Sequence, residues 1–263
     1  MSLKNVVKVM NFHALLRVDK SRRAAAKFGQ MEQMVIDMLD LIQNNRNIAL
    51  DMSALKFPES APALHIYLGG DMGFCGNLNS LVKGRCQESI RQGVRAERIL
   101  VGKKLRLYQE PSVVLEMSRE EFAENHQAIL DLLARGITEK RYSEIRLIYN
   151  HYRNASEIDF VDKVILPLPK GLIGDKAYLD DFVWEGEPQR MMQELLILYL
   201  TYELEIAGYV SAAAENLTRQ NVTTESLKRI DEREEEQRRV ERKERKAKEF
   251  SKVLDNFTRL RNY

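Results

Sequence analysis

The chain has 263 residues, of which 44% are hydrophobic and 30% are charged, and its formal net charge is only +2. So small a net charge gives no reason to expect nucleic acid, an acidic substrate or an anionic membrane as the main partner. The high share of charged residues, with only 13 glycines and 6 prolines, favours long helices over an all-β fold.

The first element is a long helix, and we expect residues 1–55 to form an N-terminal stalk. Between residues 4 and 46 the only glycine or proline is Gly29. Apolar residues recur there at steps of three and four, which indicates one helical stripe: Phe28, Met31, Val35, Met38 and Ile42. The preceding stretch "RVDKSRRAAAKF" is basic and nearly without a stripe. Pro58 and Pro62 then end the helix.

Residues 56–186 alternate between strand and helix patterns, which predicts an α/β domain. Five segments have the composition of strands: "LHIYLGG", "RILVG", "SVVLEM", "IRLIYNHY" and "FVDKVILPLP". Helical stretches lie between them, at Leu78–Gly93 and at Phe122–Lys140. The alternation predicts a Rossmann-like α/β body with a parallel or mostly parallel sheet.

Residues 187–263 are predicted to form one long C-terminal helix. After Pro188, which suits a first helical turn, the only glycine or proline up to Asn262 is Gly208. Such a helix would be roughly 110 Å long. Its first part has a heptad seam: Leu195, Tyr199, Tyr202, Ile206, Tyr209 and Ala213. We expect this seam to pair with the first helix in an antiparallel coiled-coil stalk.

The seam is followed by a charged run, Asp231–Glu249, with eight acidic and eight basic residues and one large apolar residue, Val240. The run could be disordered, but acids precede bases by four residues at several places, which favours a solvated single helix. The first helix is long enough to pair with the last one up to about Arg229 or Ile230. Beyond that point the last helix has no partner and should be polar all round.

An apolar tip follows the charged run, with Phe250, Val253, Leu254, Phe257 and Leu260. A tip of this kind at the end of a charged helix needs a surface to sit in. The arrangement is that of a shaft on a globular body, and we expect neither a catalytic residue nor a cofactor.

The glycine loop "GGDMGFCGNLNS", Gly69–Ser80, follows the first predicted strand. Its spacing is G-x-x-G-x-x-G at Gly70, Gly73 and Gly76, whereas a dinucleotide fingerprint needs G-x-G-x-x-G and a P-loop ends in Gly-Lys. We therefore expect a structural turn, with Asn77 or Asn79 near the N-cap of the next helix.

Other chemistry-bearing residues do not form a recognisable constellation. None of the four histidines, at positions 13, 65, 126 and 151, has a partner at metal-ligand spacing. Cys75 and Cys86 are too few for a disulfide framework or a zinc site, and we expect ordinary thiols in a reducing compartment. We also expect no signal peptide and no membrane span, because no run approaches about 18 apolar residues.

Two groups of basic residues are candidates for contacts with a partner. Lys20, Arg22 and Arg23 lie on the first helix, and the charged run contributes a second group: Arg238, Arg239, Arg242 and Arg245. Both could touch nucleic acid phosphates, but no aromatic residues are interleaved for base stacking. An acidic protein partner or plain solvation fits better.

The layout resembles the gamma subunit of rotary F-type ATP synthases. In "DMGFCGNLNS" the residues that match that family are Gly73, Cys75, Gly76, Leu78 and Asn79. "ILVGKK" resembles its next strand and turn, and "IRLIYNHYRNASEIDFVDKVILPLP" resembles its strand pair. In the last helix Ser211, Ala213, Glu215 and Arg219 have the family's spacing.

The resemblance implies a non-catalytic central-stalk rotor subunit that couples ion-driven rotation to ATP synthesis or hydrolysis. The implied partners are a threefold head of α- and β-type ATPase subunits, an epsilon-type subunit and a membrane c-type rotor ring. The basic groups, with Phe250, Leu254 and Phe257, would contact the stator, and no cofactor, nucleic acid or direct membrane insertion is implied. The chain would lie peripherally at the cytoplasmic face of the inner membrane or on the mitochondrial matrix side.

The sequence departs from the family in two places. The first helix keeps only Asn11 and the basic character of the family's pattern, and the charged run replaces the family's tyrosine-asparagine-lysine-x-arginine stretch. A divergent paralogue from an alternative rotary ATPase is therefore one possibility. The other hypotheses are a coiled-coil adaptor or assembly protein that self-associates along Leu195, Tyr202 and Tyr209, and a nucleotide-dependent enzyme.

Overall fold

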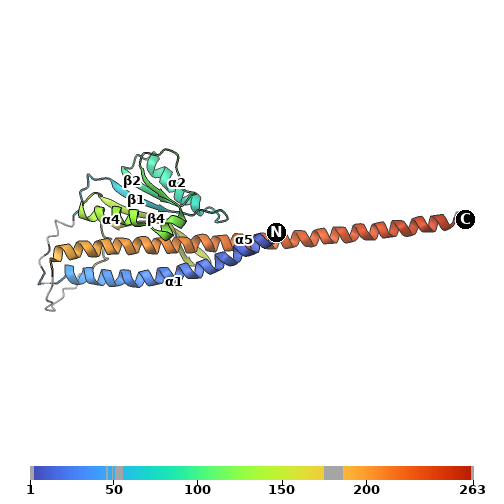
Figure 1. Ribbon diagram of the computed structural model, residues 1–263, viewed down its shortest axis with the longest axis horizontal. Helices are drawn as coiled ribbons and strands as arrows, with labels where there is room; N and C mark the ends of the chain where they lie inside the picture. Colours follow the sequence, from blue (N-terminus) through green and yellow to red (C-terminus); the bar gives the residue numbers. More distant parts are fainter. Residues whose placement is uncertain (1–2, 46, 49, 51–55, 175–185, 262–263) are drawn as a thin grey trace.

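The computed structural model describes residues 3–45, 47–48, 50, 56–174 and 186–261. Two helices form a rod with an α/β body on one side, and one of them continues far beyond the other (Figure 1). Helix α1 spans Leu3–Gln43 and helix α5 spans Pro188–Arg261, with 41 and 74 residues. The predicted boundaries after residues 55 and 186 adjoin segments outside the described residues and stay predictions.

The body is built on a five-stranded sheet in the order β3-β2-β1-β4-β5. The first three strands along the chain and β4 run parallel, and β5 returns antiparallel beside β4. The strands are β1 Ala63–Leu68, β2 Ala96–Val101, β3 Val113–Met117, β4 Glu144–Asn154 and β5 Glu157–Leu166. All five predicted strand segments form, and the prediction of a mostly parallel sheet is confirmed.

The two faces of the sheet are covered differently. Side chains alternate along a strand, so Leu64, Ile66 and Leu68 of β1 enter the large core shared with α1 and α5. Tyr67 points to the other face, where α2 (Leu78–Arg91) closes a smaller core through Val82 and Cys86. The stalk helices are therefore part of the main core and not an appendage.

The predicted helical stretch Phe122–Lys140 is confirmed for α4, Gln127–Thr138, but its first residues belong to a separate helix, α3, Arg119–Glu124. Helix α3 begins with a capping box in which Ser118 and Glu121 satisfy each other's backbone N–H groups. Asn125 is extended, and its side-chain oxygen accepts from the Gln127 N–H and starts the next helix. The turn at Asn125 thus divides the stretch into two helices, although the apolar periodicity alone predicts one.

The antiparallel pair of α1 and α5 forms as predicted (Figure 1). Phe28 of α1 packs against two seam tyrosines, with ring centroids 6.0 Å from Tyr202 and 5.6 Å from Tyr209. Tyr199 is fully buried and Leu195 is 8% exposed. The adaptor hypothesis requires self-association along Leu195, Tyr202 and Tyr209. In the structure this seam packs instead against α1 and the core of the same chain.

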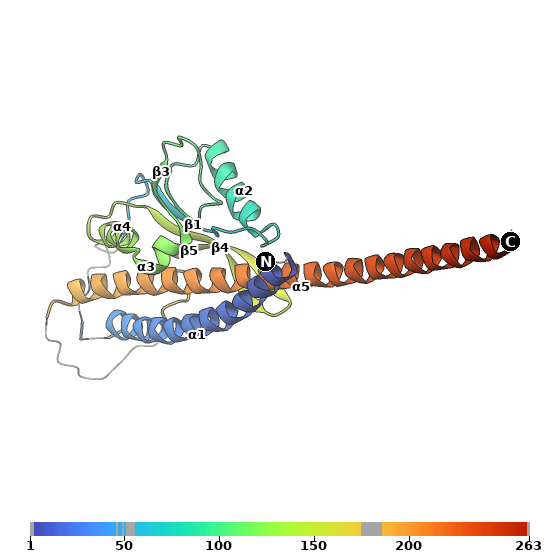
Figure 2. The ribbon, with the colours of Figure 1, turned by 45° about the vertical axis from the view of Figure 1, so that its right-hand side comes forward.

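The pairing ends close to where the helix lengths predict. Lys4, in the first turn of α1, forms ion pairs with Asp231 at 2.5 Å and Glu234 at 2.7 Å. From Glu235 to Val253 every residue of α5 is exposed, and the helix projects alone (Figures 1 and 2). Residues 235–261 make about 40 Å of unaccompanied helix.

The charged run is helical, and its ion pairs follow the predicted acid-to-base spacing of four residues only in part. Glu235 binds Arg239 at 2.7 Å, as the spacing predicts. Glu234 is instead taken by Lys4 of α1, and Arg245 lies 3.9 Å from Glu249. Because these pairs are exposed, they support the helix weakly and leave its charges available to a partner.

The expectation that no stretch is apolar enough to span a membrane needs a correction for α5. By length and composition α5 contains an 18-residue window apolar enough to cross a membrane, with a mean hydropathy of 1.3, of which half is buried in the molecule. The apolar part of α5 packs against α1 and the sheet. Its hydropathy is accounted for by that packing.

Candidate functional site

The glycine loop lies against one face of α5. A Cβ on Gly70 would come within 2.4 Å of the Glu215 carboxyl carbon, and one on Gly76 within 3.3 Å of the Thr218 methyl. The Arg219 Nε donates to the Gly73 carbonyl over 3.3 Å. The three α5 residues are spaced by three and four, so they share one helix face. The loop is therefore attached to the shaft at a single turn.

A buried ion pair holds this turn together. Arg219 Nη2 lies 2.5 Å from Glu215 Oε1, and the two side chains are only 6% and 14% exposed. Arg219 also donates from Nη1 to Asn216 over 2.9 Å. The guanidinium N–H groups thus donate hydrogen bonds to α5 and to the loop. These bonds offset the free-energy cost of removing both charges from water.

Inside the loop, one side chain binds a backbone N–H group and the cysteine sulfur. Asn79 Oδ1 accepts from the Gly70 N–H over 2.8 Å, and its Nδ2 donates to the Cys75 sulfur over 3.1 Å. Asn77 is the N-cap residue of α2, as predicted, although its side chain makes no cap hydrogen bond. Burial raises the pKa of the Cys75 thiol, which disfavours the reactive thiolate.

Asp71 ties the loop to the ends of the neighbouring strands, a role that sequence reasoning missed. Its Oδ1 accepts from the backbone N–H of Lys103 over 2.8 Å and of Arg119 over 2.9 Å. Gly102, in the "ILVGKK" segment, has a φ of +117°, and a Cβ there would lie 2.8 Å from the Gly69 carbonyl carbon. The close backbone contact therefore requires glycine at position 102.

The segments that resemble the gamma family are thus brought together in space. The glycine loop contacts both the "ILVGKK" turn and the Glu215–Arg219 turn of α5. Asn150, from the strand pair, donates to the Leu78 carbonyl at the start of α2 over 3.2 Å. Together they form the end of the body from which α5 projects, some 40 Å along α5 from Pro188.

Alanine substitutions at two glycines of the loop test its packing against α5. Gly70→Ala should destabilise the chain by about 1–3 kcal/mol, because the added methyl meets a carboxylate that Arg219 holds in place. Gly73→Ala is the matched control, since a Cβ at that position meets nothing within 4 Å. Urea unfolding of both variants measures the difference, and equal costs would mean that the loop is not packed on α5.

A half-buried ion pair fixes the α3–α4 corner to α5. His126 Nε2 lies 3.1 Å from Glu205 Oε1, and its ring stacks on Phe122 with centroids 4.7 Å apart. The hydrogen bond to Glu205 raises the pKa of His126 above its usual value. The raised pKa means that the folded chain binds the proton more tightly than the unfolded chain.

This raised pKa predicts a pH-dependent contribution to stability. The contribution is fully present below the unfolded histidine pKa of about 6.5 and is lost as the pH rises through the folded value. His126→Gln should therefore cost about 1 kcal/mol at pH 5.5 and less at pH 9. His13→Gln, on the exposed side of α1, is the control. A cost for His126→Gln that does not change with pH would contradict the ion pair.

The basic residues predicted on the first helix lie on the surface of α1. Arg23 pairs with Asp19 at 2.8 Å, and the Arg22 guanidinium lies 5.4 Å from the centre of the Tyr152 ring. Lys20 lines a cleft of about 430 Å³ between α1, the glycine loop, α3 and α5. Their contact with a stator stays a prediction.

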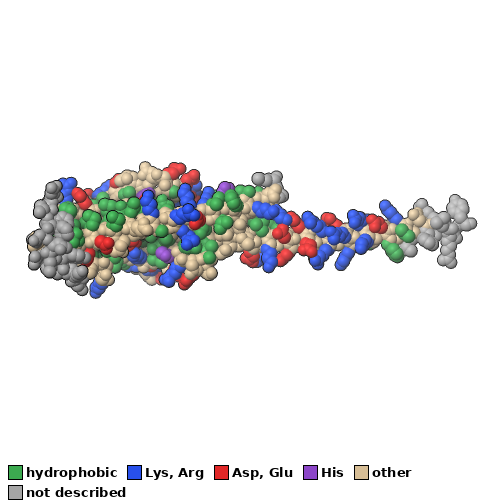
Figure 3. Space-filling view, turned by 90° about the horizontal axis from the view of Figure 1, so that it is seen from below, with side chains coloured by type: hydrophobic (Ala, Val, Ile, Leu, Met, Phe, Trp, Pro, Cys, Tyr) green, Lys and Arg blue, Asp and Glu red, His purple; other side chains and the backbone are tan. Residues whose placement is uncertain are grey.

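The second basic group lies on the projecting helix, away from the body. Arg238, Arg239, Arg242 and Arg245 are all exposed. Acidic and basic side chains are distributed along this helix (Figure 3). Phe250 is 65% exposed, whereas the side chains of Leu254 and Phe257 lie outside the described residues. A stator role for these residues stays a prediction as well.

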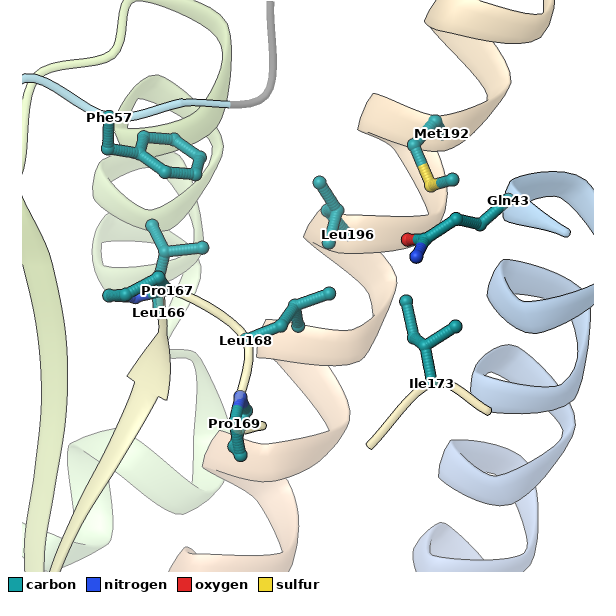
Figure 4. Close-up of a pocket in the computed structure, with 9 residues that line it drawn as sticks. All are labelled: Gln43, Phe57, Leu166, Pro167, Leu168, Pro169, Ile173, Met192 and Leu196. Carbon is teal, nitrogen blue, oxygen red and sulfur yellow. The ribbon is translucent and has the colours of Figure 1, made fainter. Parts of the chain in front are cut away.

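An apolar pocket of about 250 Å³ lies at the opposite end of the body, between the end of β5, α1 and α5 (Figure 4). Leu168 and Leu196 point into the same space, and Gln43 reaches it from α1. Its lining side chains include no acid, base or nucleophile. Within the described part of the chain, no group of three or more potential metal ligands is placed to hold an ion.

Comparison with known proteins identifies the family. A family model described as ATP synthase matches residues 1–249. The chain belongs to this ATP synthase family. An "ATP synthase gamma chain" from Prochlorococcus marinus (strain MIT 9515) is 26% identical over 275 residues, which cover 87% of each chain. The gamma chain of Geobacter metallireducens is 22% identical and covers 81% of this chain and 76% of its own.

Solved structures from ATP synthases have the same fold. The central stalk/c-ring structure of the Tetrahymena thermophila mitochondrial ATP synthase matches 84% of this chain and 99% of its own, with a TM-score of 0.57 and 16% identity. A Euglena gracilis mitochondrial ATP synthase structure matches 95% and 94%, with a TM-score of 0.52 and 12% identity. The resemblance to the gamma subunit is confirmed, because the family model covers most of the chain and the curated relatives are ATP synthase gamma chains.

Proposed function

We propose that this gamma-type chain is a non-catalytic shaft that turns inside a threefold ATPase head. The observation that carries the proposal is the length of α5 beyond α1, about 40 Å of single helix, in which every residue from Glu235 to Val253 is exposed. A globular protein does not gain stability from such a helix. A helix of this shape and polarity suits a channel formed by other chains.

Coupling would work through differential contact. Three chemically equivalent subunits around one asymmetric shaft meet three different surfaces, so rotation shifts which conformation each of them prefers. The residues from Glu235 to Glu249 are exposed and nearly all polar, with Val240 as the one large apolar side chain. Such a surface has few deep apolar contacts to break as the shaft turns.

Torque must also pass from the body to the projecting helix without slipping. The buried Glu215–Arg219 pair and the glycine loop fix α5 to the body. About 18 Å further along α5, the Lys4 ion pairs with Asp231 and Glu234 fasten the N-terminal end of α1 to it. These contacts hold the base of the projecting helix to both the body and α1.

The proposed partners are the α- and β-type subunits of the head, an epsilon-type subunit and a c-type rotor ring. The structural neighbours are a central stalk with a c-ring and an F1 with a c-ring. The chain would then be a peripheral part of a membrane-associated complex, at the cytoplasmic face of the inner membrane or on the matrix side. The exposed arginines of α5 would face acidic loops of the head.

Observation of rotation tests the proposal. Both native cysteines are buried, so Tyr108→Cys, at a residue that is 90% exposed on the body, offers a selective attachment point for a bead. In the complex with immobilised heads, ATP should drive the bead in one direction with three stops per turn. A bead that stays still while the same complexes hydrolyse ATP would contradict the rotor role.

A further inference from the structure

A histidine lies under α2 in the middle of the sheet, with an arginine on each side. His65 of β1 is only 6% exposed and is in register with Arg98 of β2 and Arg146 of β4. All three lie on the face that α2 covers, since the alternate residues Leu64 and Ile66 enter the core shared with the stalk helices. Three side chains able to carry a positive charge thus form one row across three parallel strands.

The carboxylates beside this row are already engaged by arginines. Glu144 and Asp162 each bind Arg146 at 2.7 Å, and Asp162 also binds Arg85 of α2 at 2.8 Å. His65 Nε2 lies 3.9 Å from Glu144, which is beyond hydrogen-bond distance. A protonated His65 would therefore have to compete with Arg146 for its nearest carboxylate.

Arg98 adds a positive charge on the other side of the histidine. Its guanidinium donates to the carbonyls of Ala96 and Val94 and to the Ser89 hydroxyl, and it forms no ion pair within the described part of the chain. Three arginines and two carboxylates leave one net positive charge here while His65 is neutral. A proton on the ring would add a second net charge under α2, in a place with little water.

The contacts of the ring suit its neutral form. The Tyr67 hydroxyl lies 3.4 Å from His65 Nδ1, which can accept its proton in one neutral tautomer. Burial, first, and the two neighbouring arginines lower the pKa of His65 to about 4, although the two carboxylates act in the opposite direction. The contacts and the charge count therefore agree on an uncharged ring at neutral pH.

We propose that His65 is an acid-sensitive switch, whose neutral ring allows α2 to close on the sheet and whose protonated ring opens it. Helix α2 closes the smaller core through Val82 and Cys86, and it begins within the glycine loop, at Leu78. Opening would thus loosen the glycine loop as well, whereas α1 and α5 pack on the other face of the sheet. The switch belongs to the body and does not depend on rotation inside a head.

The sign of the pH dependence follows from linkage. Because the folded pKa lies below the unfolded histidine value of about 6.5, the opened chain binds a proton that the closed chain does not bind. The stability that the neutral ring contributes is fully present above about pH 6.5, falls as the pH drops to about 4 and is constant below that. Between pH 7 and 5 the opening constant of α2 should rise about 20-fold.

Hydrogen exchange of the full chain at pH 7 and 5, corrected for intrinsic rates, tests the switch. In the wild type the protection of the α2 amides should fall about 20-fold between the two values, and in His65→Gln by less than about threefold. His13→Gln, which removes an exposed histidine of α1, should behave as the wild type. An equal fall in His65→Gln, or no fall in the wild type, would overturn the proposal.

Magnetic resonance of the histidine rings gives a second measurement, which does not depend on a variant that folds. The His65 ring signals, assigned through their correlations to the backbone, should keep the chemical shifts of neutral imidazole down to pH 5 in the folded wild type. A His65 signal that titrates at or above pH 6 would show that the site accepts the charged ring, and the switch would be excluded.

Discussion

Replacing Arg219 with alanine is expected to lower the free energy of unfolding by about 3–5 kcal/mol, the cost of leaving one charge of a buried pair without its partner. Glu215 would remain 14% exposed against the glycine loop, with Gly70 directly beside its carboxylate. The loop would also lose the hydrogen bond from Arg219 to the Gly73 carbonyl. Urea unfolding at neutral pH measures the effect.

The same helix contains a matched control for this variant. Arg229 pairs with Glu225 at the same spacing and at the same distance of 2.5 Å, but the two side chains are 69% and 62% exposed. Arg229→Ala should therefore change stability by no more than about 0.5 kcal/mol. If the two variants cost the same, Arg219 does not join α5 to the body.

Replacing all four arginines of the projecting helix with glutamine is expected to slow its association with the head by about 10–100-fold at low salt, because electrostatic steering contributes that much to encounter rates. Arg238, Arg239, Arg242 and Arg245 are exposed, so the fold should be unaffected. Glutamine and arginine have similar helix propensities, which keeps the helix intact. Stopped-flow mixing of the chain with purified heads gives the rate, and torque in the rotation assay should fall with it.

A lysine variant at the same four positions is the control, since it keeps the charges. It should associate nearly as fast as the wild type, and the difference between the glutamine and wild-type chains should shrink as salt is raised. Unchanged association and torque in the glutamine variant would remove these residues from the stator contact.

The stalk could be predicted from the sequence because its signals are long and periodic. The heptad of the last helix and the stripe around Phe28 meet in one interface. The comparison of helix lengths placed the end of pairing at about Arg229 or Ile230, and Lys4 contacts Asp231 and Glu234. Pattern and length suffice here because the contact repeats along the helices.

The details that sequence reasoning missed depend on single contacts between distant segments. Asn125 splits one predicted helix through a local turn, which periodicity does not register. Asp71 acts by accepting from backbone groups that are brought near only by the sheet. The Lys163–Glu203 ion pair joins β5 to α5 across 40 positions of the chain.

The candidate site was recognised in pieces. The glycine loop, the "ILVGKK" segment and the Glu215–Arg219 stretch each stood out by resemblance to the gamma family, but their mutual packing did not follow from any of them. The absence of a phosphate fingerprint favoured a structural turn, and the structure adds the close contacts that the glycines allow. Gly70 and Gly102 allow close approach to α5 and to the loop backbone, respectively.

The most direct test of the rotor role is the copy number of this chain in its native complex. The tagged chain should be purified from its own cells in mild detergent, and the complex weighed intact by mass spectrometry. The account predicts one copy with three α-type and three β-type ATPase chains. Two or more copies bound to each other, without ATPase chains, would contradict it and favour the adaptor hypothesis.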